Sequence, residues 1–394
     1  MAYYPDWVDI RPEDVPFHLF DWIDFAFALP TNSMGLTWDN PDSAPEKLHQ
    51  LVSRAHSCGT KVKLSVGGWT GSKYFSSAVR TQKARDLFAN SIYDVYNEFN
   101  LDGIDLDWEY PGRGGADGNE IDPDDSSNFL LFLQKLRSVL PADTCITAAV
   151  QTVPFMDAQG EPMKDLKPFA ALLNWTMLMN YDVWTSSPFP GPNAPMYDGC
   201  QNSTQPESNA VAGVQKWTSA GFSSAQLVLG VPSYGYLSSS SAQGLRQRRR
   251  ARPNRLRNGA PADVKLVGED GQIMFRELVK QGALVRIPPT DNTSYSTFAT
   301  FVGAGGFTRS WDGCSGTPYL HSDSAQQTIS YDDNESLRMK AEFAKGTGMG
   351  GVNMFNADGD TEQRDLIEAI RQGLSATGII ENIQKDSMTT VVRA

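Results

Sequence analysis

The sequence predicts an α/β protein, a (β/α)8 TIM barrel with an insertion between its seventh and eighth strands. Two observations predict this fold: eight short apolar runs typical of strands, and helix-length segments between most of them. Strands that alternate with helices form parallel sheets, and eight such units close into a barrel whose sites lie at the carboxyl ends of the strands. The expected strands are residues 2–7, 22–29, 61–69, 103–110, 145–153, 175–183, 227–236 and 350–355.

Two of the intervening segments have a clear helical pattern. In residues 80–99, apolar side chains from Ala84 to Phe99 recur at helical spacing. Residues 124–140 show the same periodicity, with Asp125 and Ser126 as candidate caps at the beginning. A final helix is expected at residues 361–373.

The fourth strand carries an unusual row of acids. Strand side chains alternate between two faces, so Asp105, Asp107 and Glu109 point one way and the apolar residues between them point the other. Carboxylates roughly 6.6 Å apart along one strand face cost several kcal/mol if they are buried without proton sharing or hydrogen bonds. This row therefore predicts a functional site rather than a solvated edge strand. Asp102 has the opposite parity and is assigned a structural role.

The pattern Asp-x-x-Asp-x-Asp-x-Glu that ends at Glu109 resembles the signature of glycoside hydrolase family 18, the chitinases and their relatives. The resemblance implies that Glu109 is the general acid, that Asp107 handles the acetamido group of the substrate, and that Asp105 shares a proton with Asp107. It implies a chitinase that hydrolyses β-1,4 bonds of chitin and N-acetylglucosamine oligomers without a cofactor or a metal.

Two segments on other predicted strands resemble the same family. Residues 65–68 match its Ser-x-Gly-Gly motif, which implies that the Ser65 hydroxyl supports Asp105. Tyr3, by the same resemblance, reaches a hydrogen bond to Asp105 from beneath; a core tyrosine is the alternative. Residues 179–182 are similar to its Met-x-Tyr-Asp motif.

The second of these motifs implies two roles for the sixth strand. The Tyr181 hydroxyl would lie beside the acetamido oxygen, and Asp182 would bind a sugar hydroxyl. Tyr234 lies in a segment of the seventh strand that is similar to a segment of the same family, in which the first tyrosine lines the cleft. The alternative is that Tyr234 is a core aromatic residue.

The eighth strand departs from the pattern of the family. Many members place a tryptophan there as the floor under the reacting sugar, whereas the aligned residue here is Phe355. A phenyl ring still offers a stacking face, but a smaller one that lacks the indole N–H. Trp69 and Trp184, together with Tyr234, favour chitin as the substrate.

The resemblance implies a retaining, substrate-assisted mechanism, an exception to the usual scheme of two carboxylates. The N-acetyl oxygen of the substrate would attack the anomeric carbon, while Glu109 protonates the departing oxygen and then activates water. Distance alone would also suit an inverting glycosidase with Asp107 as the base. Two other functions stay open: an endo-β-N-acetylglucosaminidase that acts on N-glycans, and a chitin-binding lectin without activity, which typically lacks the acid.

Composition restricts the partners. The net charge of −12 over 394 residues argues against nucleic acid and is compatible with a neutral or cationic polysaccharide. The sequence contains no run of about 18 apolar residues, so no membrane span is predicted. The four histidines are scattered, so no metal site is expected. We expect a monomer.

The compartment is indicated by the cysteines rather than by a leader, because the N-terminal residues do not have the pattern of a signal peptide. Either the protein is cytosolic or a signal peptide has been removed. Cys200 and Cys314 lie in two predicted loops of similar sequence and are expected to form a disulfide, with free thiols as the alternative. Asn-x-Ser/Thr triplets at Asn202, Asn292 and Asn334 also favour secretion, and we expect an extracellular protein.

The predicted organisation is a single catalytic barrel at residues 1–374 with an insertion at 237–330, followed by a C-terminal tail at 375–394. The first part of the insertion has seven arginines between residues 246 and 257 in an otherwise acidic chain. We interpret this basic run as an exposed loop; a protease-sensitive site and a contact to an anionic surface are the alternatives.

Overall fold

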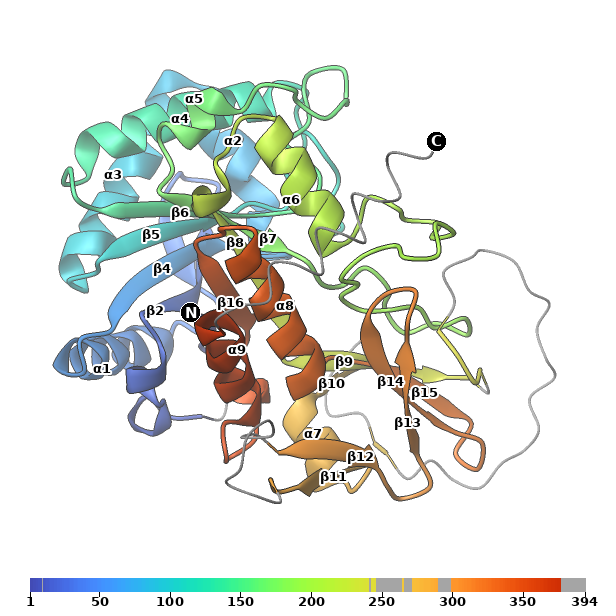
Figure 1. Cartoon of the computed structure of the whole chain (residues 1–394). Coiled ribbons are helices and arrows are strands. Elements are labelled where there is room, and N and C mark those ends of the chain that lie inside the picture. Colours follow the sequence, from blue (N-terminus) through green and yellow to red (C-terminus); the bar gives the residue numbers. More distant parts are fainter. Residues whose placement is uncertain (9, 241, 246–263, 266–270, 290–298, 377–394) are drawn as a thin grey trace.

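A closed barrel of eight parallel strands forms the centre of the computed structural model, which describes residues 1–8, 10–240, 242–245, 264–265, 271–289 and 299–376 (Figure 1). Neighbouring strands follow the order β1-β16-β8-β7-β6-β5-β4-β2, and pairing of β1 with β2 closes the ring. The strands are β1 (Ala2–Pro5), β2 (Trp22–Pro30), β4 (Lys61–Gly67), β5 (Gly103–Asp107), β6 (Cys145–Val150), β7 (Trp175–Met179), β8 (Leu227–Pro232) and β16 (Gly351–Phe355). The predicted (β/α)8 barrel is confirmed. The short strand β3 (Leu36–Trp38) pairs antiparallel with β2.

Helices surround the barrel and mostly connect successive strands (Figure 1). The helix expected at residues 80–99 is confirmed as α3, which begins after Thr81 because this residue has extended backbone and its side chain accepts from the Ala84 amide. The helix expected at 124–140 is confirmed as α4, although Asp125 and Ser126 lie inside it rather than at its cap. The helices are α1 (Ala44–Ser57), α2 (Phe75–Arg80), α3 (Gln82–Glu98), α4 (Asp125–Val139), α5 (Lys167–Ala170), α6 (Ala210–Ser219), α7 (Phe275–Lys280), α8 (Asn334–Gly346) and α9 (Asp365–Ser375).

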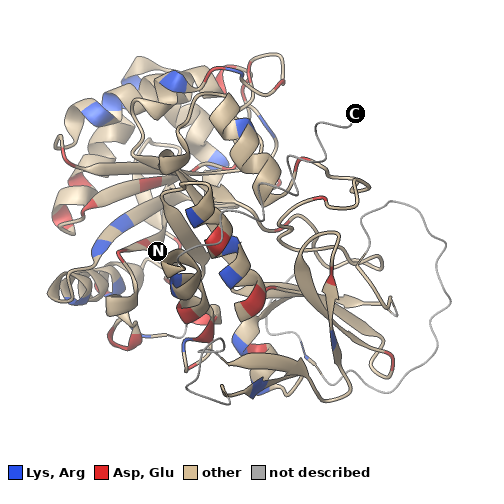
Figure 2. Cartoon of the chain, viewed as in Figure 1, with Lys and Arg blue, Asp and Glu red and all other residues tan. Residues whose placement is uncertain are grey.

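The main apolar core lies between the strands and the helices. On β5, Ile104 and Leu106 are fully buried on the outward face, and Trp108 just beyond the strand stacks on Phe75 with ring centroids 5.0 Å apart. The alternate residues face the barrel interior, as the parity of the sequence predicts. Figure 2 shows that charged residues occur on the barrel strands as well as on the outer helices.

The prediction of one continuous seventh strand at residues 227–236 is wrong, because the chain bends at Ser233. β8 ends at Pro232, and β9 (Tyr234–Ser239) leaves the barrel for another sheet. The Ser233 hydroxyl donates to the Asn356 carbonyl and accepts from the Asn356 amide, so the strand end is bound to the loop after β16. Two consecutive apolar strands separated by one serine cannot be distinguished from one strand by composition.

Between β8 and β16 the chain forms two small antiparallel sheets. The first has the order β10-β9-β15-β14-β13, and the second pairs β11 with β12. Their strands are β10 (Gln272–Met274), β11 (Leu284–Ile287), β12 (Thr300–Gly303), β13 (Thr308–Asp312), β14 (Thr317–Ser322) and β15 (Gln327–Ser330). The division into a catalytic barrel, an insertion and a tail stays a prediction. The arginine run, the triplet at Asn292 and residues 377–394 of the expected tail lie outside the described residues.

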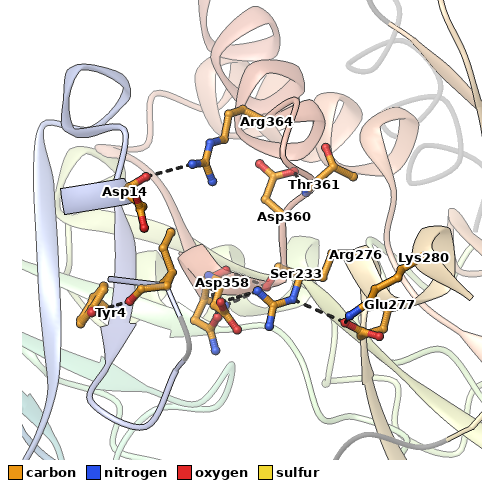
Figure 3. A network of polar contacts seen from close by, with 12 residues as sticks. Tyr4, Asp14, Ser233, Arg276, Glu277, Lys280, Asp358, Asp360, Thr361 and Arg364 are labelled. Atoms are coloured by element: carbon orange, nitrogen blue, oxygen red, sulfur yellow. Dashed lines mark hydrogen bonds and ion pairs between the residues drawn. The ribbon is translucent and has the colours of Figure 1, made fainter. Parts of the chain in front are cut away.

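Ion pairs attach this segment to the barrel. Arg276 of α7 contacts Asp358, in the loop after β16, at 2.5 Å, and Figure 3 shows its guanidinium between Asp358 and Glu277. Arg286 of β11 binds Asp365 at the beginning of α9 at 2.9 Å. The segment between β8 and β16 therefore binds the chain between β16 and α9 at two points.

The predicted disulfide between Cys200 and Cys314 is confirmed, with Cα atoms 5.1 Å apart. It joins the long loop after β7 to the turn between β13 and β14. The triplet at Asn334 is a poor candidate for glycosylation, since Asn334 is 2% exposed and begins α8. Within the described residues, none of the helices is long and apolar enough to cross a membrane.

Replacing Cys200 and Cys314 together by serine is expected to lower the free energy of unfolding by roughly 2–4 kcal/mol. The crosslink spans 114 residues, so its loss enlarges the conformational freedom of the unfolded chain. Denaturant unfolding of the double variant, with Cys58→Ser at an exposed free cysteine as the control, measures the effect. Equal stability of the double variant and the parent would contradict it.

Candidate active site

Three hydroxyl groups from three strands hold Asp105 inside the barrel. Its Oδ2 accepts from Tyr3 of β1 and from Ser65 of β4, both at 2.8 Å, and its Oδ1 accepts from Thr147 of β6 at 2.6 Å. Asp105 is 1% exposed. Hydrogen bonds that donate to a carboxylate stabilise its ionised form and fix its orientation. The expected contacts of Tyr3 and Ser65 are present, and that of Thr147 was not predicted.

Asp107 and Glu109 follow at the carboxyl end of β5. Asp107 is 4% exposed, and its Oδ1 is buried without a hydrogen-bond partner among the described residues. Burial, together with the charges of Glu109 and Asp105, raises the pKa of Asp107 well above its usual range. Burial also raises the pKa of Glu109 to about 7, although a hydrogen bond with the Tyr110 hydroxyl lowers it in part. Burial thus favours the protonated form of both carboxyl groups.

Close approach of two strands requires glycine in the motif that follows Ser65. Gly67 has a φ of 116°, and a Cβ atom there would lie 2.2 Å from the Asp107 carbonyl oxygen. Any side chain at this position would therefore displace β5 and its carboxylates.

Tyr181 and Asp182 lie just beyond the end of β7. Tyr181 is half-buried, and desolvation with the nearby charges of Asp107 and Asp182 raises its pKa well above the usual range. Asp182 Oδ1 accepts from the Tyr234 hydroxyl at 2.6 Å and from the Tyr236 hydroxyl at 2.7 Å. Tyr234 is 2% exposed, so its burial favours a role in supporting Asp182 rather than a role in lining the cleft.

Tyr236 and Gln272 were not predicted from the sequence. The Gln272 amide of β10 donates to the Tyr236 hydroxyl at 3.0 Å, so that hydroxyl directs its single hydrogen to Asp182. The segment between β8 and β16 thus contributes to the site. Only the position of Tyr236 at the end of an apolar run could have indicated this contact.

Aromatic rings surround the carboxylates. Phe355 lies 5.3 Å from Tyr3 and 6.0 Å from Tyr181, measured between ring centroids. Trp69 is 53% exposed and lies edge-on to Tyr110 at 6.5 Å, so a large apolar face meets solvent beside Glu109. Such exposed rings near polar groups are typical of carbohydrate contacts at a binding cleft.

Two further aromatic residues at this end of the barrel were not predicted as site residues. Trp7 follows β1 and is 47% exposed, and its ring lies 5.9 Å from that of Phe27, which in turn lies 6.3 Å from Tyr3. The rule that barrel sites form at the carboxyl ends of strands could have indicated Trp7. Trp184, by contrast, packs against Gly191, where a Cβ would lie 2.4 Å from its ring.

In the portion of the chain that the structure describes, no three side chains of His, Cys, Asp or Glu are grouped to hold an ion. His56 instead contacts Asp102 at 2.8 Å, and Asp102 also accepts from the Val62 amide. These contacts agree with the structural role predicted for Asp102.

The closed parallel barrel, with buried carboxyl groups at the end of β5 and aromatic rings around them, defines the architecture of a glycoside hydrolase. The model of the family described as "Glycosyl hydrolases family 18" matches residues 1–360. The chain belongs to this family.

Individual relatives agree with this assignment. A "chitinase-like effector" of Moniliophthora roreri is 35% identical over 395 residues, which cover 94% of this chain and 92% of the relative. The crystal structure of a chitinase from Rhizomucor miehei is 31% identical, with a TM-score of 0.78, and the match covers 95% of this chain and 99% of that one. A class V chitinase variant from Nicotiana tobaccum in complex with NAG4 shares the fold at 22% identity, with a TM-score of 0.75 over 96% of this chain and 99% of that one.

Proposed function

We propose that the protein is a chitinase that hydrolyses β-1,4 bonds of chitin and N-acetylglucosamine oligomers with retention of configuration. The observation that carries this proposal is Glu109, a buried acid with a pKa of about 7 at the carboxyl end of β5. A carboxylic acid protonated near neutral pH can donate a proton to a leaving oxygen and take one from water afterwards.

In this mechanism the acetamido group of the substrate is the nucleophile. Its carbonyl oxygen attacks the anomeric carbon as Glu109 protonates the departing glycosidic oxygen, which gives an oxazolinium intermediate and a free chain end. Asp107 Oδ1, buried and without a partner among the described residues, accepts the acetamide N–H, and the negative charge that Asp105 and Asp107 share offsets the positive charge. The Tyr181 hydroxyl orients the acetamide carbonyl. Glu109, now ionised, removes a proton from water, and this water attacks the anomeric carbon from the face that the leaving group left. The bond between the anomeric carbon and the acetamide oxygen breaks, which restores the acetamido group.

Three further residues bind sugar in this proposal. Asp182 accepts from a sugar hydroxyl, Trp69 stacks on a ring beside Glu109, and Phe355 supports the reacting sugar. Three others act through the aspartates: Tyr3 and Ser65 hold Asp105, and Tyr234 holds Asp182. The NAG4 ligand of the Nicotiana relative and the chitinase names of other relatives support an N-acetylglucosamine oligomer as the ligand. The disulfide supports the proposal that the protein is secreted. We also propose that the protein acts as a monomer.

A second candidate is a protein that binds chitin without cleaving it. The name of the Moniliophthora roreri relative, "chitinase-like effector", favours this alternative, as does the smaller floor that Phe355 offers. Glu109 argues against it, because the acid that hydrolysis requires is present.

Release of reducing ends from colloidal chitin and from an N-acetylglucosamine tetramer separates the candidates. The proposal expects new reducing ends from both substrates. Binding of both substrates without cleavage would move the assignment to a lectin. If neither is bound and an N-glycan is cleaved instead, the protein is an endo-β-N-acetylglucosaminidase.

Activity is expected to fall as the pH rises through about 7. Glu109 must be protonated to donate, and its pKa of about 7 means that half of the free protein has lost this proton at that pH. The test is the pH profile of kcat/KM on the tetramer, followed from pH 4 to 9 in steps of roughly half a unit, whose basic limb gives the pKa of the acid. A profile that stays level to pH 9 would exclude Glu109 as the acid.

A further inference from the structure

A buried lysine lies directly beneath the carboxylates and has no part in the mechanism so far. Lys63 of β4 is 1% exposed and forms an ion pair with Asp24 of β2 at 3.0 Å. Asn353 of β16 donates to the other oxygen of Asp24 at 2.8 Å. The ammonium also lies 4.9 Å from the centre of the Trp175 ring. An ion pair at this depth requires these contacts because desolvation is costly, and an apolar pair would fill the same space at less cost.

The third contact of Lys63 leads to the active site. Its ammonium donates to Thr147 Oγ1 at 2.8 Å, and Thr147 donates to Asp105 Oδ1 at 2.6 Å. An ammonium has only donors, whereas a hydroxyl has a single hydrogen. Because Lys63 occupies the oxygen of Thr147 as an acceptor, the hydrogen of Thr147 must point to Asp105.

Asp105 is consequently an acceptor on both oxygens. Tyr3 and Ser65 donate to Oδ2, and the hydroxyl that Lys63 orients donates to Oδ1. Two donors occupy both lone pairs of Oδ2, whereas Oδ1 keeps one lone pair that can accept a proton held by Asp107. Three donated hydrogen bonds favour the ionised form of a carboxyl group. We propose that Lys63 is a positioning residue which, through Thr147, holds the negative charge of the acidic pair on Asp105 and leaves the shared proton on Asp107.

This inference rests on the proposed function and extends it to the acid range of activity. A pair with one proton has one negative charge to offset the positive charge on the substrate nitrogen. A pair with two protons has none, so protonation of Asp105 ends activity at low pH. The titratable and charged groups around Asp105 and Lys63 are Tyr3, Asp24, Asp107, Cys145, Tyr181 and the Met1 amino group.

Thr147→Val tests the link, because it removes the hydroxyl and leaves the ion pair of Lys63 and Asp24 in place. We expect the acid limb of kcat/KM on the tetramer to move up by about one pH unit, since a carboxylate that loses a donor takes up a proton more readily. An acid limb that stays at the parental pH would overturn the proposal.

Two controls separate this role from packing. Thr147→Ser keeps the hydroxyl, so its acid limb is expected at the parental pH. Thr176→Val makes the same change at a fully buried threonine of β7 whose Oγ1 has no partner in the described part of the chain, and it is expected to leave the acid limb in place. If Thr176→Val shifts the limb as far as Thr147→Val does, the proposal is wrong.

Lysine itself is tested as a pair with its counter-ion, because Lys63→Met alone leaves Asp24 buried and unpaired. Lys63→Met combined with Asp24→Asn is expected to shift the acid limb in the same direction as Thr147→Val. A lower melting temperature with an unmoved acid limb would mean that the ion pair is only structural.

A readout without substrate keeps the test independent of the proposed function. Carbon NMR of protein labelled at the aspartate carboxyl carbons, with Asp105 assigned through Asp105→Asn, gives its pKa directly. If the parent cleaves no chitin oligomer, the proposed function fails, and this titration still decides the role of Lys63. The pKa of Asp105 is expected to rise in Thr147→Val, and equal values in variant and parent would overturn the inference.

Discussion

Glu109→Gln is expected to reduce hydrolysis of the N-acetylglucosamine tetramer at least ~10²-fold, the scale of a lost general acid. The amide has nearly the same shape as the carboxyl group, but it cannot transfer a proton to the leaving oxygen. The contacts that support Asp105 do not involve the Glu109 side chain, so sugar binding is expected to persist. Initial rates and calorimetric titration of the tetramer measure the two effects separately.

Glu98→Gln is the matched control for this substitution. Glu98 is exposed at the end of α3, so the same chemical change there is expected to leave the rate at the parental level. Parental activity in Glu109→Gln would refute the assignment of the acid. A loss of tetramer binding as large as the loss of rate would indicate that Glu109 mainly holds substrate.

Lys340→Met is expected to lower the free energy of unfolding by about 3–5 kcal/mol. Lys340 of α8 is fully buried, and its ammonium contacts Asp332 and the Ala194 carbonyl, both at 2.6 Å. Removal of the ammonium leaves the Asp332 charge buried without its partner. Denaturant unfolding followed by fluorescence and by circular dichroism measures the loss.

Two variants decide whether the buried charge is the cause. Lys345→Met changes an exposed lysine of the same helix and is expected to have little effect on stability. Asp332→Asn added to Lys340→Met removes the unpaired charge and is expected to restore part of the loss. If the double variant is no more stable than Lys340→Met, lost packing rather than charge explains the effect.

Much of the barrel could be predicted because its strands are short apolar runs between helices. Alternation on β5 correctly placed Asp105 and Asp107 in the interior and Ile104 and Leu106 against the helices. The break at Ser233 could not be predicted, since a turn made by hydrogen bonds to Asn356 leaves no mark on an apolar run. Long-range contacts decide such strand ends.

The site divides in the same way. Ser65, which lies within a recognisable motif, donates to Asp105 as the sequence predicts, and the role of Tyr181 toward the substrate stays a prediction. Lys63 and Asp24 could not be assigned, because charged residues in a strand usually face solvent and only closure of the barrel turns these two inward. Tyr236 and Gln272 meet Asp182 through a sheet whose pairing has no local signal.

The central claim is hydrolysis with the substrate's own acetamido group as the nucleophile, and proton NMR of the first products from the N-acetylglucosamine tetramer tests it most directly. Attack by water on the same face as the departing group predicts that the new reducing end appears first as the β anomer and later equilibrates. Initial formation of the α anomer would contradict this account and indicate an inverting enzyme with Asp107 as the base. A tetramer that is bound and stays intact would contradict catalysis itself.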